Sequence, residues 1–300
     1  MKIGRYVIEV SNQDKVLFGK SGITKGDLID YYAKVSPIMM PYCDGRPISM
    51  QRFPNGIDGE GFYQKDAGDY FPDWITTIAI ARQSEGSVNY VVIDKPATLV
   101  YLANQACITP HVWLSRSDSI DKPDRMIFDL DPADNLSFVD VQSVVKKLKS
   151  LLDEIGLPTF YMVTGSRGVH VVVPLKRVYT FEETRAFAHD VALLLAEKYP
   201  KEITVNVHKK ERKGRVFIDW LRNAFGATGV APYSVRPLEG APVAMPVTWD
   251  GLCKRGMTSQ KYTIKNVFKH IEVVGDVWQG MQKHAVSLTK ARKLLDAMKT

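Results

Sequence analysis

The feature that most constrains the fold is the order of the elements between Arg125 and Trp220. Hydrophobic periodicity predicts strand, helix, strand, strand, helix and strand in turn, at residues 125–131, 137–155, 160–164, 169–175, 180–199 and 216–220. This is the order of the split βαβ sheet in ferredoxin-like and RNA-recognition-motif proteins. We therefore expect an α+β fold built on such a sheet.

The preceding segments are also mixed. Helical spacing of apolar residues behind a Thr24 cap predicts a helix at 23–40, which Pro41 ends. Segments 74–81 and 90–103 are rich in β-branched residues and predict strands separated by turns. The absence of an internal sequence repeat argues against a repeat protein.

The charge of the chain favours a polyanionic partner. Forty Lys and Arg residues against 33 Asp and Glu give a formal net charge of +7 and a pI near 9.1. The excess lies in residues 252–300, which hold ten basic and three acidic residues. Basic character elsewhere must therefore come from local patches.

Cysteine usage and hydropathy bear on location. Cys43, Cys107 and Cys253 form no C-x-x-C pair, which argues against a disulfide framework or a zinc ribbon and indicates a reducing compartment. The N-terminus lacks the apolar core of a signal peptide, and no apolar run approaches the roughly 20 residues of a membrane span. We expect a cytoplasmic protein with no membrane partner.

Three acidic residues are candidates for metal binding. Asp129 and Asp131 are two apart in an expected strand, so both side chains leave the same face and can share a cation. Solvated acids at a strand end are the ordinary alternative. Asp219 favours the metal hypothesis, because a carboxylate inside the apolar strand VFIDW is costly unless a cation or hydrogen bonds compensate. Three carboxylates on adjacent strands can hold two Mg²⁺ or Mn²⁺ ions, as polymerases and nucleases do for phosphoryl transfer.

The glycine turn TGSRGVH at 164–170 has the composition of a phosphate site. It combines flexible backbone, two hydroxyls and two potential cations, and we interpret it as a cradle for a triphosphate. An ordinary hairpin turn followed by a core histidine is the alternative.

The run KKERKGR at 209–215 is either a solvated hairpin tip or a loop that binds a nucleic-acid backbone. RFP at 52–54 and FYQK at 62–65 interleave cations with aromatics, as base-stacking platforms do, although core packing also explains such aromatics.

Longer motifs are more specific. In order they read NQDKV, GITKGDLIDYYAKVSPIMMPY, GRPISMQRFPNG, GFYQK, HVWLSR, FDLDP, TGSRGVHVVVPL, VFIDW and APYSVRPLEGAPVAMPVTWD. On these motifs nearly the whole chain resembles the polymerase domain of the bacterial and archaeal end-joining DNA ligase D, a branch of the archaeo-eukaryotic primase superfamily. The resemblance implies a two-lobed primase-polymerase fold, with an RNA-recognition-motif-like catalytic sheet packed on an N-terminal α/β unit. As one domain, 1–300, it would comprise an N-terminal lobe at 1–120, a catalytic core at 121–250 and a basic C-terminal segment at 251–300.

The resemblance also implies an activity. It is template-directed addition of nucleotides, often ribonucleotides with Mn²⁺, to a primer 3′-hydroxyl at gaps and double-strand breaks. The implied DNA partner has gaps or 3′-protruding ends and carries a 5′-phosphate. The ligase and phosphoesterase modules that accompany this domain in bacteria are missing from the 300 residues. A stand-alone polymerase implies a Ku-type end-binding protein, a separate ligase and a phosphoesterase as partners, at the DNA of the nucleoid.

Roles for individual residues follow from the resemblance by position. Catalysis and metal binding fall to Asp129, Asp131 and Asp219, the last also assisting the primer 3′-hydroxyl. Nucleotide binding falls to Arg52, Thr164, Ser166, Arg167, Gly168, His170 and Arg236. The downstream 5′-phosphate falls to Asn12, Lys15 and Lys25, and the DNA end and template to Phe62, Tyr63, Lys65 and Arg212. His111 lies in a family motif near the active site without an assigned role, and the family often has a basic residue where this chain has Gln51.

Other classes stay open on the sequence. A two-metal nuclease uses the same acids but needs no triphosphate cradle. A non-catalytic module that binds DNA ends or RNA would use the basic loops, but it does not account for the acid in VFIDW. A polymerase-β-like nucleotidyltransferase is disfavoured, because its Gly-Ser element precedes the paired acids, whereas Gly165 and Ser166 follow them here.

Overall fold

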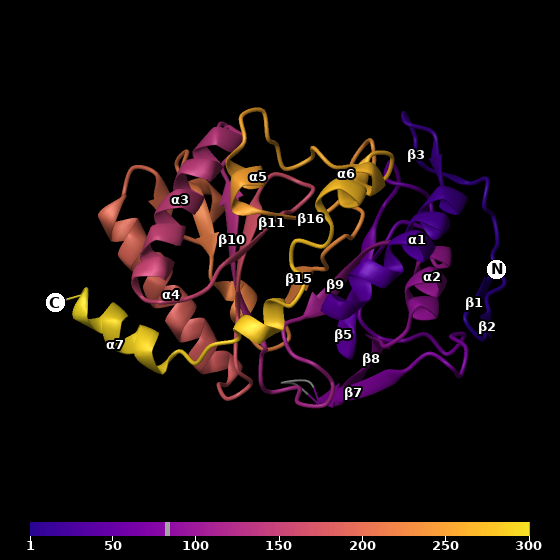
Figure 1. The fold of residues 1–300 in the computed structure, drawn as a ribbon. Coiled ribbons are helices and arrows are strands. Elements are labelled where there is room, and N and C mark those ends of the chain that lie inside the picture. Colours follow the sequence, from indigo (N-terminus) through magenta and orange to yellow (C-terminus); the bar gives the residue numbers. More distant parts are fainter. Residues whose placement is uncertain (82–84, 300) are drawn as a thin grey trace. The chain divides into compact units, whose positions relative to one another are not determined.

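A computed structural model describes residues 1–81 and 85–299 (Figure 1). Residues 82–84 of the predicted N-terminal lobe and Thr300 of the predicted C-terminal segment lie outside the described residues. The α+β fold is confirmed, since the chain forms two compact units that each combine helices with a six-stranded sheet. Unit 1 consists of Met1–Asp118, Thr228–Ala244 and Tyr262–Val273, and unit 2 of Ser119–Ala227, Met245–Lys261 and Val274–Thr300. The sequence-based boundaries did not anticipate that 228–244 and 262–273 return to unit 1.

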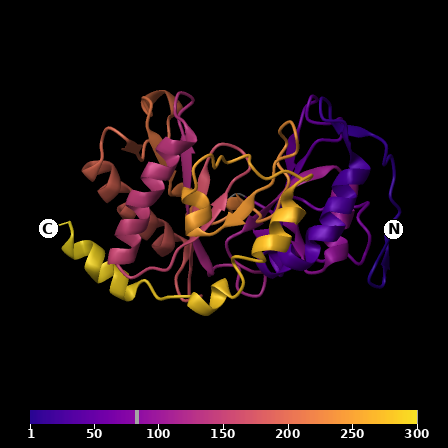
Figure 2. The ribbon, with the colours of Figure 1, turned by 45° about the horizontal axis from the view of Figure 1, so that its top comes forward.

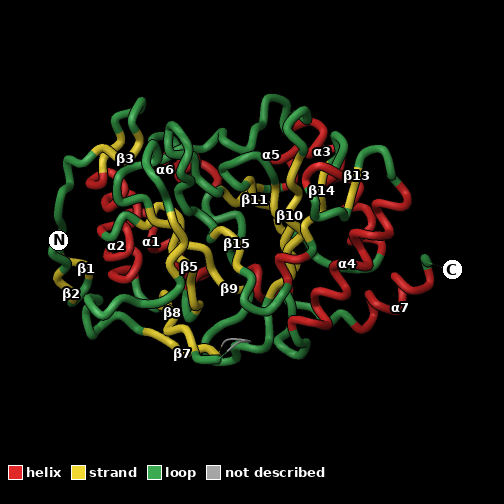
Figure 3. The backbone as a smooth tube through the Cα atoms, turned by 180° about the vertical axis from the view of Figure 1, so that it is seen from behind, coloured by secondary structure: helices red, strands yellow, loops and turns green. Residues whose placement is uncertain are grey.

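The sheet of unit 2 contains the predicted β-α-β-β-α-β order. Its strands are β10 (Arg125–Pro132), β11 (Phe160–Val163), β12 (Val169–Pro174), β13 (Ile203–Thr204), β14 (Val216–Asp219) and β16 (Met245–Val247). They lie in the order β13-β14-β10-β12-β11-β16, and neighbours are antiparallel except for β13 and β14. Figure 3 shows β13, β14, β10 and β11 following one another across this sheet. The predicted strands thus occupy the middle of the sheet, with β10 between β14 and β12.

Helices α3 (Phe138–Glu154) and α4 (Phe181–Lys198) cover one face of this sheet (Figures 1 and 2). Both begin at a capping box, as at Thr180 and Glu183, where side chain and backbone satisfy each other's donors. From β10, the fully buried Met126, Phe128 and Leu130 belong to the apolar core. Because successive side chains alternate across a strand, Asp129 and Asp131 leave from the other face of β10.

The remaining helices of unit 2 are short. They are η1 (Lys209–Glu211), η2 (Leu221–Asn223), α5 (Trp249–Cys253), η3 (Met281–His284) and α7 (Thr289–Ala297). Arg292 of α7 and Lys299 beyond it pair with Asp190 of α4, which fixes α7 beside that helix (Figure 2). Nowhere in 1–81 or 85–299 is a helix long and apolar enough to cross a membrane.

Unit 1 is built on a second sheet. Its strands are β5 (Arg46–Arg52), β6 (Phe62–Gln64), β7 (Thr77–Ala81), β8 (Ser87–Ile93), β9 (Cys107–Trp113) and β15 (Thr228–Val230). The order is β15-β9-β5-β8-β7, with β6 paired to β5. The helices are α1 (Lys25–Cys43), α2 (Pro96–Asn104) and α6 (Val267–Val274), and two small hairpins join β1 (Lys2–Ile3) to β2 (Tyr6–Val7) and β3 (Val16–Phe18) to β4 (Ile23–Thr24).

Two sequence-based expectations for unit 1 were wrong. Helix α1 does not end at Pro41 but continues through Pro37 and Pro41 to Cys43. Pro37 has no N–H for the Ala33 carbonyl, and the Ser36 hydroxyl donates to that carbonyl instead, at 2.9 Å. Residues 96–104, expected as part of a β-rich stretch, form helix α2 with Pro96 in its first turn, where a missing N–H costs nothing.

Candidate active site

Three carboxylates gather on the sheet of unit 2. In the register of the sheet, Asp129 on β10 lies directly opposite Asp219 on β14 and, on its other side, opposite His170 on β12. Asp131 follows two residues along the same face of β10. The side chains of Asp129 and Asp219 are each 15% exposed and that of Asp131 is 32% exposed. The structure therefore brings together the three acids that the sequence singled out, at the edge of the buried core.

Arg222 joins two of these acids. Its Nε lies 3.2 Å from Asp129 Oδ2 and 3.1 Å from Asp219 Oδ2. The short helix η2 places Arg222 one turn after Asp219, and Asp219 Oδ1 accepts the N–H of Leu221 at 3.0 Å. A single positive group is thus held between carboxylate oxygens of neighbouring strands.

The two facing carboxylates have unequal acidity. Burial by itself raises the pKa of Asp129, but the charge and hydrogen bond of His170, followed by those of Arg222, outweigh it and lower this pKa to about 2. Burial raises the pKa of Asp219, against the opposing charge of Arg222, and the nearby charge of Asp129 adds to the rise. Asp129 is therefore the stronger acid of the pair.

Asp131 is paired with two other arginines. Arg212 Nη1 lies 2.7 Å from Asp131 Oδ2, and Arg167 Nη2 lies 3.5 Å from Asp131 Oδ1. The guanidinium of Arg212, in a residue only 8% exposed, stacks over the Phe217 ring at 4.2 Å from its centroid. Arg212, expected at the DNA end, is thus anchored here against a candidate metal ligand.

The donor set suits hard divalent cations, because all three side chains offer carboxylate oxygens. Arg222 Nε marks a point at which oxygens from two strands already meet one cation. Among the described residues, however, no three His, Cys, Asp or Glu side chains converge in a group arranged to hold a metal ion. Each carboxylate is instead neutralised by arginine, so metal binding at these residues requires arginine contacts to be exchanged for metal contacts.

The glycine turn between β11 and β12 lies against the strand that carries the aspartates. A side chain at Gly168 would collide with the Leu130 carbonyl, since a Cβ there would fall 3.2 Å from its carbon and closer still to its oxygen. Leu130 lies between Asp129 and Asp131, so the turn packs on β10 at the carboxylate site. Ser166 and Arg167 are the members of the turn that are partly or largely exposed.

The side chains of Thr164 and His170, both predicted to bind nucleotide, contact protein groups in this structure. The buried Thr164 hydroxyl accepts the N–H groups of Ser166 and Gly168 within the turn, so it shapes the cradle rather than lining it. His170 is 3% exposed, and its Nε2 lies 3.5 Å from Asp129 Oδ1. Its buried Nδ1 has no hydrogen-bond partner within residues 1–81 and 85–299. His170 thus contacts a candidate metal ligand directly.

Two residues of the site escaped the sequence analysis. Arg222 is one, and its only signal was a cation three residues after Asp219, on the same side of a helical turn. The other is the fully buried Asn223, whose side-chain amide accepts the N–H of Ile127 and donates to its carbonyl, both at 2.8 Å. Asn223 thereby acts as a strand partner for β10 just before Asp129.

Within unit 1, the residues assigned to a 5′-phosphate come together. Lys25 N–H donates to the Lys15 carbonyl at 2.8 Å, and Lys15 N–H donates to the Asn12 carbonyl at 3.1 Å. Asn12 has a positive φ of 51°, and Lys25 Nζ contacts Ser11 Oγ at 3.2 Å. Burial, and then the charge of Lys15, lower the pKa of Lys25. Lys15 and Lys25 thus bring two cationic side chains to one short region of unit 1, with Lys15 Nζ on Asn55 Oδ1 at 3.2 Å.

The remaining candidates also lie in unit 1. Phe62 and Tyr63 on β6 are 44% and 58% exposed, Lys65 follows them at the surface, and the Tyr63 ring contacts His111. Arg52, predicted to bind nucleotide, donates to the Gln105 carbonyl at 2.8 Å and to Gln64 Oε1 at 2.6 Å. Half-buried Arg236 lies in the loop after β15.

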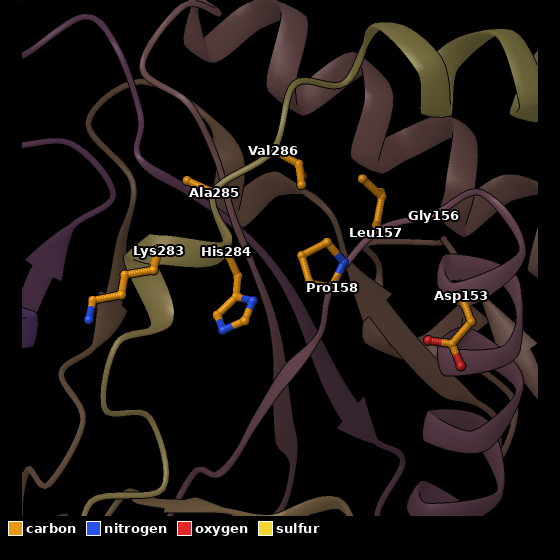
Figure 4. Close-up of a pocket in the computed structure, with 8 residues that line it drawn as sticks. All are labelled: Asp153, Gly156, Leu157, Pro158, Lys283, His284, Ala285 and Val286. Carbon is orange, nitrogen blue, oxygen red and sulfur yellow. The ribbon is translucent and has the colours of Figure 1, made fainter.

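Two cavities in unit 2 differ in their relation to the site. One, of about 320 Å³, borders the glycine turn and is lined by Pro132, Ala133, Asp134, Leu136, Ser137, Phe138, Ser166, Arg167, Thr258, Ser259 and Gln260. The other, of about 520 Å³, lies between the loop before β11 and residues 283–286 (Figure 4). It is at the opposite ends of β11 and β12 from the turn, and none of the predicted site residues lines it.

A split βαβ sheet with two aspartates on its central strand and a third directly opposite defines a nucleotidyltransferase of the primase-polymerase class. Comparison with known proteins is specific about the family. A family model described as "LigD, primase-polymerase domain" matches residues 24–278. The chain belongs to this family of DNA-directed nucleotidyltransferases.

Relatives of known name agree with this assignment. The chain is 33% identical over 304 residues to the multifunctional non-homologous end joining DNA repair protein LigD of Mycobacterium tuberculosis, covering 98% of this chain and 40% of the relative. It is 30% identical over 269 residues to the bifunctional non-homologous end joining protein LigD of Bacillus subtilis, covering 89% of this chain and 43% of the relative. The chain thus spans about 40% of the length of these proteins.

A solved structure shows the same fold. The polymerase domain of Mycobacterium tuberculosis ligase D, in complex with DNA, matches with a TM-score of 0.87 and 32% sequence identity. The match covers 93% of this chain and 99% of that chain.

Proposed function

We propose that this protein is a template-directed polymerase that adds nucleotides, with a preference for ribonucleotides, to a primer 3′-hydroxyl at gaps and double-strand breaks. The observation that carries the proposal is the pairing of Asp129 with Asp219 across two strands, with Asp131 on the same face and a glycine turn packed against the strand between them. Such a site offers carboxylates for metal ions and, beside them, a turn that can bind a triphosphate. A nuclease does not need a triphosphate-binding turn.

The carboxylates are the residues that would hold two divalent cations, Mn²⁺ or Mg²⁺, which enzymes of this class need. Bound there, the metals would lower the pKa of an attacking hydroxyl and offset charge on the leaving pyrophosphate. Asp129 is ionised throughout the neutral range, since its pKa is about 2. Asp219, the weaker acid of the facing pair, suits the assigned contact with the primer 3′-hydroxyl.

The basic side chains around the site have two uses in this proposal. Arg167 and Arg212 hold Asp131, and Arg222 holds the facing pair. If the carboxylates held metals, these planar guanidinium groups would be available to donate paired hydrogen bonds to oxygens of the triphosphate. Neutralisation of the acids and recognition of the nucleotide would thus use the same arginines in turn.

The DNA substrate would be bound by unit 1. Exposed Phe62 and Tyr63 offer stacking surfaces for unpaired bases, and Lys15 with Lys25 offers a site for the 5′-phosphate of the downstream strand. Because the relatives are named for non-homologous end joining, we propose a Ku-type end-binding protein, a ligase and a phosphoesterase as its collaborators at the nucleoid.

Primer extension on gapped DNA tests the proposal. The substrate carries a 5′-phosphate at the gap, and ribonucleotides and deoxynucleotides are compared in Mn²⁺ and in Mg²⁺. We expect template-dependent extension, faster with ribonucleotides and Mn²⁺. The same duplex is also incubated with metal but no nucleotide. Shortened strands would show that the protein is a nuclease instead. DNA binding that weakens with salt, with no product formed, would show that it is a non-catalytic end-binding module.

The phosphate site of unit 1 gives a separate prediction. Changing Lys15 and Lys25 together to alanine removes two cations, so the preference for 5′-phosphorylated over unphosphorylated gaps is expected to fall about tenfold. Changing the exposed Lys20 to alanine in the same segment serves as the control and should leave the preference intact. If the unaltered protein uses both kinds of gap equally, the phosphate site has no basis.

A further inference from the structure

The glycine turn between β11 and β12 is closed by Thr164, whose backbone N–H donates to the Gly168 carbonyl at 3.1 Å. Thr164 Oγ1 accepts the N–H groups of Ser166 at 3.4 Å and Gly168 at 3.3 Å, both long for such bonds. It lies 3.1 Å from the Gly168 carbonyl, to which it donates. These contacts close the turn but leave its outer residues, Ser166 and Arg167, with little support from within.

Ser259 supports the turn from a distant part of the chain. Its hydroxyl donates to the Gly168 carbonyl at 2.8 Å and lies 3.3 Å from Thr164 Oγ1. Ser259 lies in the segment after α5, 91 residues from Gly168 in sequence, and is 3% exposed. Without this hydroxyl the Gly168 carbonyl would lose the shortest of its three hydrogen bonds and keep the two from the Thr164 N–H and hydroxyl, both at 3.1 Å.

Gln260 adds a second support. Its Nε2 donates to the Ser166 carbonyl at 2.9 Å. Ser259 and Gln260 therefore hydrogen-bond to the backbone of the turn on both sides of Arg167, at Gly168 and at Ser166. Arg167 is the turn residue whose guanidinium reaches Asp131, at 3.5 Å. The position of Arg167 is thus set by its ion pair with Asp134, by the turn and by the segment 259–260.

Resting on the proposed function, we propose that Ser259 and Gln260 are positioning residues for the incoming nucleotide. They do not need to touch the triphosphate. They hold Ser166 and Arg167 in the place where these side chains can meet phosphate oxygens beside Asp131. Rigid support of this kind lowers the ordering cost of binding, and its loss weakens nucleotide affinity more than it slows the chemical step.

Changing Ser259 to alanine tests the positioning role. In primer extension we expect the KM for the ribonucleotide to rise about fivefold, from the loss of one buried hydrogen bond, with kcat within about twofold of the unaltered protein. The KM for DNA should not change. Binding of a fluorescent ribonucleoside triphosphate in Mn²⁺, with no DNA present, should weaken by the same factor. S259T, which keeps the hydroxyl, should restore most of the affinity, and the double variant S259A/Q260A should bind more weakly than S259A.

A matched variant separates positioning from general stability. Thr184 on α4 is fully buried, and its hydroxyl donates to the Thr180 carbonyl at 2.9 Å. Changing Thr184 to valine removes a comparable bond away from the turn, so it should lower the melting temperature without raising the KM for nucleotide. The inference is overturned if S259A changes the nucleotide KM and the triphosphate affinity no more than T184V does. If the unaltered protein extends no primer, the proposed function fails, and the triphosphate-binding arm still decides the role of Ser259.

Discussion

Changing Asp129 to asparagine is expected to reduce nucleotide addition by at least about 10³-fold while leaving affinity for DNA within about twofold. Asparagine keeps the shape of the side chain but not its charge, and an amide is a poor ligand for a hard cation that needs several carboxylates. The sheet should survive, because Arg222 keeps Asp219 as its partner and Asn223 still pairs with β10. Loss of activity without loss of folding therefore reports on the site itself.

The control for this prediction is another aspartate of unit 2. Asp153 on α3 pairs with Lys149 and is 51% exposed, away from the sheet face of the carboxylates. Changing Asp153 to asparagine should leave extension unchanged. If D129N retains a tenth or more of the activity of the unaltered protein in Mn²⁺, Asp129 does not act as proposed.

Changing Gly168 to alanine is expected to be the most disruptive single-methyl change in unit 2. The new Cβ would overlap the Leu130 carbonyl, and β10 cannot retreat because it lies between β14 and β12. The turn must move off the strand, at a cost of about 2–4 kcal/mol in the free energy of unfolding. Moving the glycine turn away from the aspartates should lower kcat/KM about 10²-fold.

A second glycine isolates the steric effect. Gly156 has a φ of 76° and open space where a Cβ would stand. Changing Gly156 to alanine should cost about 1 kcal/mol through backbone strain alone and leave kcat/KM intact. Chemical denaturation gives the unfolding free energies, and primer extension below the transition gives the kinetics. Unchanged stability and nucleotide KM in G168A would show that the turn does not press on β10.

Much of unit 2 was predictable because its periodicity is local. The four predicted strands and both helices between Arg125 and Asp219 have their own apolar patterns, and each helix has its own N-cap, so their order followed from residues close in sequence. The two-residue strand β13 had no such pattern and was not predicted. The spacing of Asp129 and Asp131 likewise fixed their shared face. What spacing alone left open was the register that sets Asp219 directly opposite Asp129, because register depends on how strands from different parts of the chain pair.

The features that were missed depend on contacts between distant segments. A helix that continues past Pro37 needs the Ser36 hydroxyl to replace the lost donor, and the return of 228–244 and 262–273 to unit 1 leaves no local mark in the sequence. Arg167 and Arg212 were foreseen as basic residues but not as partners of Asp131, and Arg222 was not foreseen. Ser259 carried no signal at all, since a lone serine gains its role only when the chain brings it to Gly168.

The central claim is that Asp129, Asp131 and Asp219 together hold divalent metal. Titration of Mn²⁺, followed by electron paramagnetic resonance in the presence of a ribonucleoside triphosphate, tests it most directly on the unaltered protein, D129N and D153N. We expect Mn²⁺ binding that D153N retains and that D129N weakens at least about tenfold. Equal Mn²⁺ affinity in D129N and the unaltered protein would contradict it.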